Sequence, residues 1–277
     1  MTQFVSLSSG SNGNCYYIGN ECAGILIDAG IGTRTIKKRL GEVGIPVERI
    51  RCVLVSHDHF DHIRSLGTFA ERFHKPVYAT APCIAAFNRH YCTRGYLGPG
   101  RCHELVPGEW LEIESVGTEV PGARGGIFVL PFRVPHDATD TVGFFIDFFG
   151  ETFTFLTDLG AVTEDAVSFA ARSRHLIVEA NYDPEMLRTG SYPPDLQQRI
   201  RSGHGHLANA QTAELILRAL ALSGASGPLL QDVFLCHLSE NNNTPELALE
   251  TVSAAIPESI RLVALPRREH STLFTWQ

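Results

Sequence analysis

Residues 57–62 read H-D-H-F-D-H, and this string constrains the chain more than any other segment. Its side chains His57, His59, Asp61 and His62 are of the types that zinc and similar divalent ions prefer as ligands. A solvated histidine-rich loop is the alternative interpretation, but Asp61 and His62 add a second chelating pair to the first. The string follows the apolar, partly β-branched run 52–56, which indicates a buried strand. We therefore predict a metal site where a strand ends and a loop begins.

The spacing H-x-H-x-D-H after a strand resembles the metallo-β-lactamase fold superfamily, whose members hold one or two metals at the edge of an αββα sandwich. The resemblance implies three further ligands on later strand ends, a histidine, an aspartate and a histidine in that order. His136, Asp158 and His237 occur in this order, and each follows an apolar or strand-like run. We therefore take these three residues as the remaining ligands.

The resemblance distributes seven ligands over two divalent ions, zinc or manganese. The first ion would take His57, His59 and His136, the second Asp61, His62 and His237, and Asp158 would bridge them. Two metals roughly 3.5–4 Å apart share a water and lower its pKa toward about 7, so hydroxide is available at neutral pH. We expect Asp61 to serve in catalysis as well. The expected reaction is hydrolysis of an ester, amide, thioester or phosphodiester.

Further strings resemble the YycJ/WalJ-like branch of the superfamily, a nuclease-like group related to the enzymes that trim tRNA 3′ ends. These are residues 8–14 (S-S-G-S-N-G-N), 28–30 (D-A-G), 135–138 (P-H-D-A), 179–183 (E-A-N-Y-D), 205–209 (G-H-L-A-N) and 237–239 (H-L-S), the last followed by Asn241 and Asn242. The match extends from the N-terminus to about Asn243. It implies a phosphodiesterase that acts on nucleic acid, and it favours an exonuclease over an endonuclease. At Ala208 the chain has alanine where the family usually has the serine of G-H-L-S-N. This difference weakens only the idea that a serine hydroxyl is needed at that position.

The resemblance also implies a proton donor. In the tRNA-trimming relatives a histidine at a comparable helix start assists the leaving group with an acidic partner, and His206 and Glu179 are the nearest matches here. We expect no special role for His204. The loop 8–14 could cradle a phosphate with its backbone N–H groups, or it could be a plain turn between two strands.

The formal net charge of −7 contrasts with the basic excess usual in nucleic-acid-binding proteins. A local basic patch would suffice, because two metals can neutralise a phosphate. The basic residues form three clusters: Arg34, Lys37, Lys38 and Arg39; Arg188, Arg199 and Arg201; and Arg267 with Arg268. For any one cluster, a solvated helix or loop face is the more ordinary interpretation.

Two other functional classes stay open. A small-molecule metallohydrolase (a lactonase, thioesterase or cyclic phosphodiesterase) would use the same metals with a small apolar pocket. A non-hydrolytic binding protein could keep the fold, although such proteins often lose a ligand and all seven are present here. Substrate, polarity of cleavage, metal identity and oligomeric state do not follow from the sequence.

With 277 residues and 44% hydrophobic content, the chain can bury the core of one large domain, residues 1–277, without an inserted domain. Strands are predicted at residues 3–7, 16–18, 25–28, 52–56, 77–79, 110–116, 127–132, 142–149, 152–156, 176–178, 233–235, 261–264 and 272–275. Helices are predicted at 33–43, after His62, from Pro82, at 164–171, at 209–222 and from Thr244-Pro245. These helices account for residues 159–236, and residues 91–101 are predicted to be a loop. The expected class is α+β, a four-layer αββα sandwich.

The apolar stretch 143–149 is too short to cross a membrane and is better interpreted as an inner strand covered on both faces. The N-terminus lacks a signal-peptide pattern, and the seven cysteines are odd in number with no C-x-x-C pair. We expect free buried thiols in a cytoplasmic protein. Cys92, Cys102 and His103, with His90 nearby, could form a separate structural metal site, although their spacing matches no standard finger.

Overall fold

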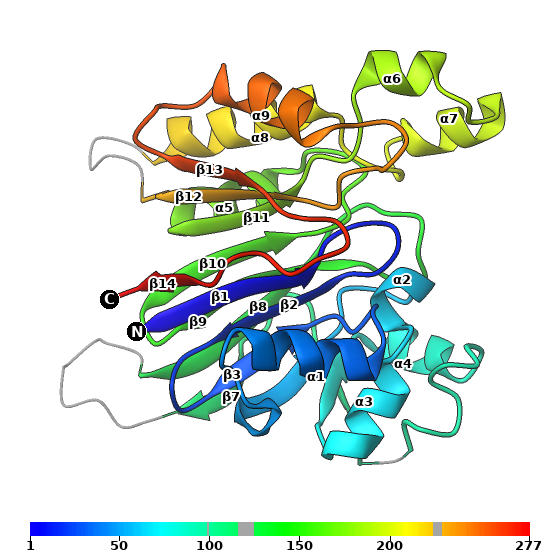
Figure 1. Ribbon diagram of the computed structural model, residues 1–277, viewed down its shortest axis with the longest axis vertical. Coiled ribbons are helices and arrows are strands. Elements are labelled where there is room, and N and C mark those ends of the chain that lie inside the picture. The colour runs from blue at the N-terminus through cyan, green and yellow to red at the C-terminus, as the bar shows by residue number, and fades with distance from the viewer. Residues whose placement is uncertain (99, 116–124, 224–228) are drawn as a thin grey trace.

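The computed structural model describes residues 1–98, 100–115, 125–223 and 229–277. Two seven-stranded sheets form its centre (Figure 1). The first runs, in spatial order, β14 (Phe274–Trp276), β1 (Thr2–Ser8), β2 (Cys15–Gly19), β3 (Gly24–Ile27), β4 (Ile50–Leu54), β5 (Val77–Ala79) and β6 (Cys102–Glu104). The second runs β13 (Arg261–Ala264), β12 (Asp232–Cys236), β11 (His175–Glu179), β10 (Glu151–Leu156), β9 (Val142–Phe148), β8 (Gly126–Arg133) and β7 (Leu111–Ser115).

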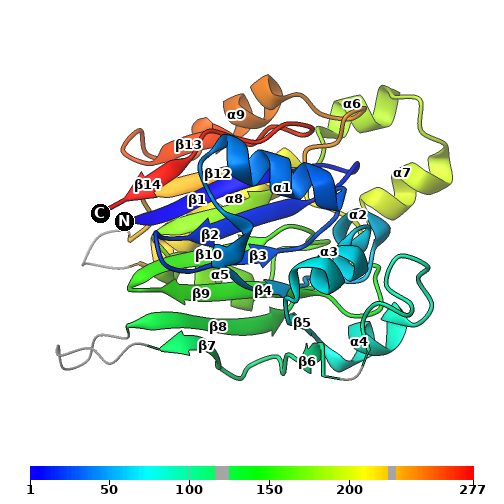
Figure 2. The same ribbon diagram turned by 60° about the horizontal axis from the view of Figure 1, so that its bottom comes forward.

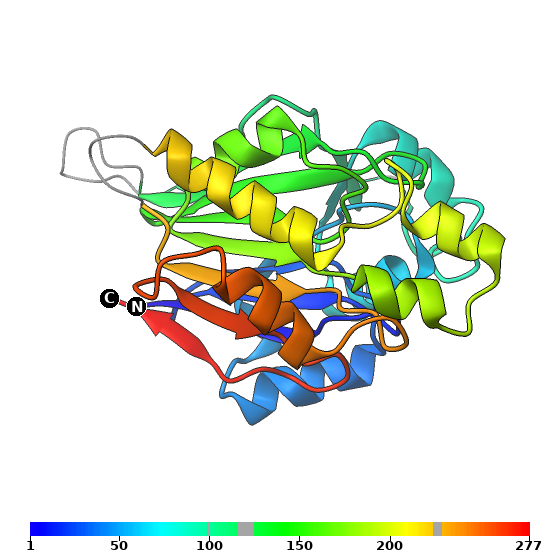
Figure 3. The same ribbon diagram turned by 90° about the horizontal axis from the view of Figure 1, so that it is seen from above.

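Helices cover the outer face of each sheet (Figures 1 and 3). The first sheet is covered by α1 (Thr33–Glu42), α3 (Leu66–Phe73) and α4 (Ala81–Phe87), with the single turn α2 (Phe60–Ile63) and the 3₁₀ turn η1 (Val47–Arg49) nearby. The second is covered by α5 (Glu164–Arg172), α8 (Asn209–Leu222) and α9 (Pro245–Ser253). Two short helices, α6 (Pro184–Thr189) and α7 (Pro194–Ile200), extend beyond the sheets at one end.

The strand residues alternate between two buried environments, which explains why the strands read as continuous apolar runs. On β12, Phe234 faces the core between the sheets, whereas Val233 and Leu235 face the covering helices. On β1, Phe4 faces the core between the sheets and Val5 faces the helices of the first sheet. The structure is therefore the predicted four-layer αββα sandwich, and β9 is the inner strand expected at residues 143–149.

Most predicted elements are confirmed within one or two residues, and β5, β13 and α8 have the predicted bounds. One prediction was wrong, because residues 159–236 also contain α6 and α7 besides the predicted helices. The short strand β6, directly after the predicted loop 91–101, was not predicted, and the last strand begins at Phe274, two residues after the predicted start. Both missed helices are too short for a clear 3.6-residue period. Val116, at the end of the predicted strand 110–116, lies outside the described residues.

The strand order brings one set of strand ends together. Strands β3 and β4 are parallel neighbours, and so are β10, β11 and β12. Their carboxyl ends therefore lie at the same end of the sandwich, where α2, α6 and α7 also lie (Figure 2). The chain termini lie at the opposite end, where Thr2 on β1 pairs with Trp276 on β14. None of the helices in the described ranges has the length and apolar character needed to cross a membrane.

Candidate active site

The H-D-H-F-D-H loop leaves the end of β4 and turns into α2. His57 and His62 are fully buried, with their ring centroids 4.1 Å apart. His59 is the residue before α2, and its side chain is 31% exposed. The single turn of α2 places Asp61 beside His62 on the side that faces the strand ends, with 3.6 Å between Asp61 Oδ2 and His62 Nε2.

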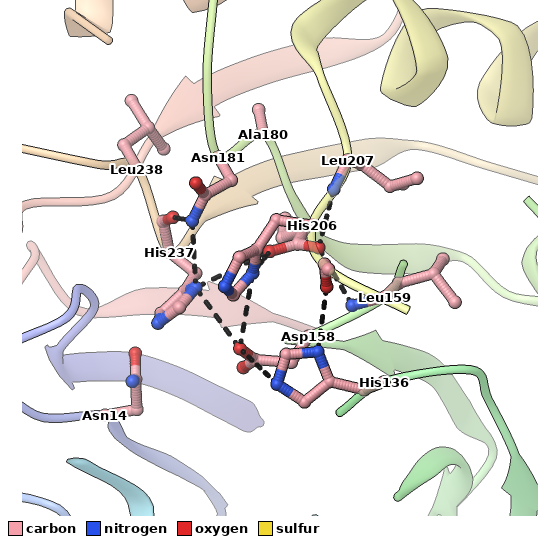
Figure 4. A network of polar contacts seen from close by, with 12 residues as sticks. Asn14, His136, Asp158, Leu159, Ala180, Asn181, His206, Leu207, His237 and Leu238 are labelled. Carbon is pink, nitrogen blue, oxygen red and sulfur yellow. Dashed lines mark hydrogen bonds and ion pairs between the residues drawn. The ribbon is translucent and has the colours of Figure 1, made fainter. Parts of the chain in front are cut away.

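Three side chains from later strand ends, those of His136, Asp158 and His237, lie close together (Figure 4), and each lies near a residue of this loop. His136 Nε2 lies 3.2 Å from His59 Nδ1, and Asp158 Oδ2 lies 3.1 Å from His62 Nε2. His237 follows β12 in a left-handed backbone conformation with φ of 51°, which is uncommon for residues other than glycine. Such strained residues concentrate at functional sites, and here the turn aims the ring of His237 at the loop.

The structure brings all seven predicted ligands together. Their nitrogen and oxygen atoms form overlapping groups, each with all atoms within 4.8 Å of one another: His57, His59 and His136; Asp61, His62 and His237; and His57, His62 and Asp158. The first two groups have the same members as the two ligand sets expected from the sequence, and Asp158 lies between them. Their role as metal ligands remains a prediction.

A second layer of hydrogen bonds orients the histidines. His62 Nδ1 donates to Asp28 Oδ2 at 2.7 Å, and Asp28 also accepts from the backbone N–H and the hydroxyl of Ser56, both at 2.8 Å. His136 Nδ1 donates to the carbonyl oxygen of Gly205 at 2.8 Å. Both rings therefore present Nε2 to the site, as metal-binding histidines do when their other nitrogen is fixed by an outer partner. Sequence reasoning missed the role of Asp28, although it directly follows β3 as other site residues follow their strands.

The donor set fits a divalent cation. Among the described residues, the buried atom His57 Nε2 has no hydrogen-bond partner, and the buried atom Asp158 Oδ2 has only the charge contact with His62 Nε2 at 3.1 Å. Burial holds the pKa of His57 well below its usual range, so its imidazole is neutral and can donate a lone pair. Burial alone would raise the pKa of Asp158, but His237 and His62 hold it well below its usual range. An ionised carboxylate and a neutral imidazole with unused buried atoms are suitable metal ligands.

His206 lies beside Asp158 and His237 (Figure 4) and forms a pair with Glu179. His206 Nδ1 lies 2.9 Å from Glu179 Oε2, and Glu179 Oε1 accepts backbone N–H groups from Leu159 at 2.8 Å and Leu207 at 2.9 Å. Burial lowers the pKa of His206, but the carboxylate of Glu179 outweighs this effect and the net pKa is raised. This arrangement suits a general acid held in a fixed orientation, because the histidine is only partly buried and the carboxylate that holds it is fully buried.

A cavity of about 230 Å³ opens onto these groups. One side is formed by candidate ligand and acid residues: His59, Asp61, Asp158, His206 and His237. The remaining lining residues include Tyr192, Leu196, Arg199 and Ile200 from the segment that contains α7. Sequence reasoning did not connect Tyr192 or Leu196 with the site, because nothing local predicts that this segment folds back over the strand ends.

The loop 8–14 also contributes to the site. Ser9 Oγ accepts the backbone N–H of His237 at 2.9 Å. Asn14 Nδ2 donates to Asp61 Oδ2 at 3.2 Å and lies 2.9 Å from His62 Nε2. Space is tight here, since a Cβ atom on Gly30 would lie 1.7 Å from the carbonyl oxygen of Asp61. The loop 8–14 therefore supports the loop 57–62. This is so whether its backbone N–H groups bind a phosphate or only form a turn between two strands.

Other candidate residues have structural partners. Asp58, inside the H-D-H-F-D-H string, accepts from the backbone N–H and hydroxyl of Thr139 at 3.0 and 2.6 Å and so holds the loop that carries His136. His90 lies 3.4 Å from Asp58, and His103 stacks on Tyr78 at 5.0 Å. Within the described part of the chain, no group of potential metal ligands includes Cys92 or Cys102. The separate cysteine–histidine site is therefore not assembled.

Most residues of the three basic clusters form hydrogen bonds or ion pairs within the protein. Arg39 donates to backbone carbonyl groups, including that of Leu7. Arg199 pairs with Asp137, and Arg267 donates to three backbone carbonyl groups. Lys37 is exposed and has neither a hydrogen-bond partner nor an ion-pair partner among the residues described. Several of the predicted basic residues therefore stabilise the fold around the site.

Comparison with known proteins places the chain in a family. The model of the beta-lactamase superfamily domain matches residues 24–222. Exodeoxyribonuclease WalJ of Streptococcus pneumoniae is 32% identical over 89% of this chain and 85% of its own length, and exodeoxyribonuclease YycJ of Bacillus anthracis is 30% identical over 92% and 89%. The metallo-β-lactamase fold protein YhfI of Bacillus subtilis superposes with a TM-score of 0.67 at 16% identity, covering 99% of each chain. The chain therefore belongs to the metallo-β-lactamase superfamily and, within it, to the family of WalJ and YycJ.

Proposed function

We propose that this protein is a metal-dependent exodeoxyribonuclease that hydrolyses phosphodiester bonds at the ends of DNA. The observation that carries the proposal is the site itself, seven converging ligand side chains with an oriented histidine–carboxylate pair beside them. The names of WalJ and YycJ, which share about a third of their residues with this chain over most of its length, supply the substrate class.

The residues divide into two working groups. His57, His59 and His136 would hold one divalent ion, zinc or manganese, and Asp61, His62 and His237 a second, with Asp158 shared. When bound, the ions would supply an activated water and stabilise negative charge on the phosphate. Asp28 and the Gly205 carbonyl keep His62 and His136 facing the site before the substrate arrives.

His206 would act as the general acid. Its Nδ1 is directed at Glu179, which leaves Nε2 to deliver a proton to the leaving oxygen of the phosphodiester. The raised pKa of His206 favours the protonated, proton-donating form of its ring. Glu179 is a positioning residue, because its buried carboxylate contacts the ring and not the cavity.

Purified protein, freed of metal and reloaded with manganese or zinc, should be incubated with end-labelled DNA and RNA and with a generic lactone and thioester. We expect metal-dependent shortening of DNA, absent without added ion and absent in Asp158→Ala. If the lactone or thioester is turned over rapidly while the DNA stays intact, the protein is a small-molecule hydrolase and the nuclease proposal is wrong. Elemental analysis of the same samples would count the ions, and close to two per chain is expected.

A further inference from the structure

The segment 184–200, which we call the hairpin, forms one wall of the active-site cavity. It contains α6 and α7 and extends beyond the sheets at the end where the strand ends meet (Figures 2 and 3). Tyr192, Leu196, Arg199 and Ile200 of this hairpin line the cavity together with the predicted ligands. The cavity therefore has a polar metal-ligand side and a partly apolar, aromatic side.

The hairpin is held in place by its own core and by hydrogen bonds. Leu187 and Ile200 belong to a small buried cluster against which Tyr192 and Leu196 pack. Asp183 caps α6 by accepting two backbone N–H groups at 3.0 and 2.9 Å, and its own N–H donates to a backbone carbonyl group in the loop after β12 at 2.8 Å. The wall is therefore formed before a ligand binds, which reduces the ordering cost of binding.

Two hydrogen bonds hold Tyr192 in addition to its packing. Its hydroxyl accepts from Asn241 Nδ2 at 3.1 Å, and its carbonyl oxygen accepts from Gln197 Nε2 at 2.9 Å. The hydroxyl therefore already has one partner, and Arg199 is paired with Asp137. Tyr192 and Leu196 contribute an aromatic ring and an aliphatic side chain to the cavity wall.

A ligand that suits both sides must carry a phosphate at one end and a flat, weakly polar ring at the other. A nucleotide has this form. The volume of about 230 Å³ is below the roughly 300–1,000 Å³ of typical ligand pockets, so the cavity suits one nucleotide unit at most and not a longer stretch of chain. We propose that the base of the terminal nucleotide stacks on Tyr192, supported by Leu196, while its phosphate lies among the ligand residues. This inference rests on the proposed nuclease function and deepens it.

Stacking on an aromatic ring tolerates all four bases, because every base has a π-face, and contributes about 1–3 kcal/mol per base. The subsite therefore favours an end carrying any base over an end without one. Because the contact is apolar, its contribution does not depend on salt, unlike contacts between basic residues and phosphates.

The test combines a change in the protein with a change in the DNA. Release of the first nucleotide would be measured at several salt concentrations, from duplexes whose terminal residue carries a base or a stable abasic sugar at either end. For base-bearing ends, Tyr192→Ala should raise KM about 5- to 150-fold at every salt concentration. Tyr192→Phe should match the wild type. For abasic ends, the wild type and Tyr192→Ala should be equal.

Tyr192→Leu provides a second variant that keeps apolar bulk in the cluster, and it should behave like Tyr192→Ala if the ring face is what binds. If DNA is degraded but the preference for a base-bearing end persists in both variants, the stacking subsite is wrong and the nuclease proposal stands. If the wild type degrades base-bearing ends no better than abasic ends, the subsite is equally wrong. If the metal-loaded wild type degrades neither duplex, the proposed function itself fails.

Discussion

His206 Nδ1 lies 2.9 Å from Glu179 Oε2, and the other oxygen of this buried carboxylate is held by two backbone N–H groups. The carboxylate cannot turn away from the ring without losing both of these bonds. The ring of His206 is thereby held at the cavity with Nε2 unused by Glu179. This relationship supports the proposal that His206 is a proton donor whose pKa is raised by Glu179.

His206→Ala should lower turnover of DNA about 10²–10⁴-fold, as expected for loss of a general acid. Its metal content should equal that of the wild type, because His206 belongs to neither of the two ligand sets predicted from the sequence, although its ring lies close to Asp158 and His237. Elemental analysis and a nucleotide-release assay on the same preparation check both statements. The matched control is His204→Ala, an exposed histidine two residues away, which should keep full activity. Similar losses in both variants would contradict the assignment.

Glu179→Gln should shift the alkaline limb of the kcat profile to lower pH. Burial lowers the pKa of His206, and the Glu179 carboxylate raises it. Glutamine carries no charge, so in Glu179→Gln the effect of burial remains and the pKa of His206 falls. An acid must be protonated to work, and a lower pKa means that activity is lost at lower pH. The profile should be recorded with saturating metal. An alkaline limb that stays in place would show that Glu179 does not tune His206.

Asp28→Asn should weaken metal binding about 10- to 100-fold, because the carboxylate that fixes His62 Nδ1 is lost. Asparagine suits this test because Asp28 has a positive φ of 59°, a conformation that asparagine tolerates well. Titration of metal-free protein against a chelator of known affinity gives the change. Asp165→Asn, an exposed change on α5, is the control and should bind metal normally. Equal metal affinities of Asp28→Asn and Asp165→Asn would show that Asp28 does not support metal binding.

Ala208→Ser should raise the free energy of unfolding by about 1 kcal/mol and the Tm by roughly 2–4 °C. Ala208 is the residue before α8, with extended backbone angles, and its methyl group cannot accept the exposed N–H groups of the first turn. A serine hydroxyl can. Thermal unfolding of both proteins checks the increase. Ala210→Ser, one residue inside the helix, should give a small decrease, and stabilisation by both changes would contradict a capping effect.

The sandwich and the seven converging side chains were predicted from two sources. Apolar runs marked the strands, and the family resemblance required a further aspartate and histidine after later strands, which Asp158 and His237 supply. Parallel strands bring such positions to one end of a sheet. Tyr192 could not be found in this way, because it follows no strand and its place depends on how the segment 184–200 packs at the end of the sandwich. Asp28 gave only a weak signal, since a single aspartate after a strand is common.

The measurement that tests the central claim most directly compares linear duplex DNA with a covalently closed circle of the same sequence, using the metal-reloaded protein. We predict that the linear form is degraded from its ends, that the circle stays intact, and that a chelator or Asp158→Ala stops degradation. Cleavage of the circle at the rate of the linear form would contradict an exonuclease. Intact linear DNA in the presence of the fully metal-loaded wild type would contradict a deoxyribonuclease altogether.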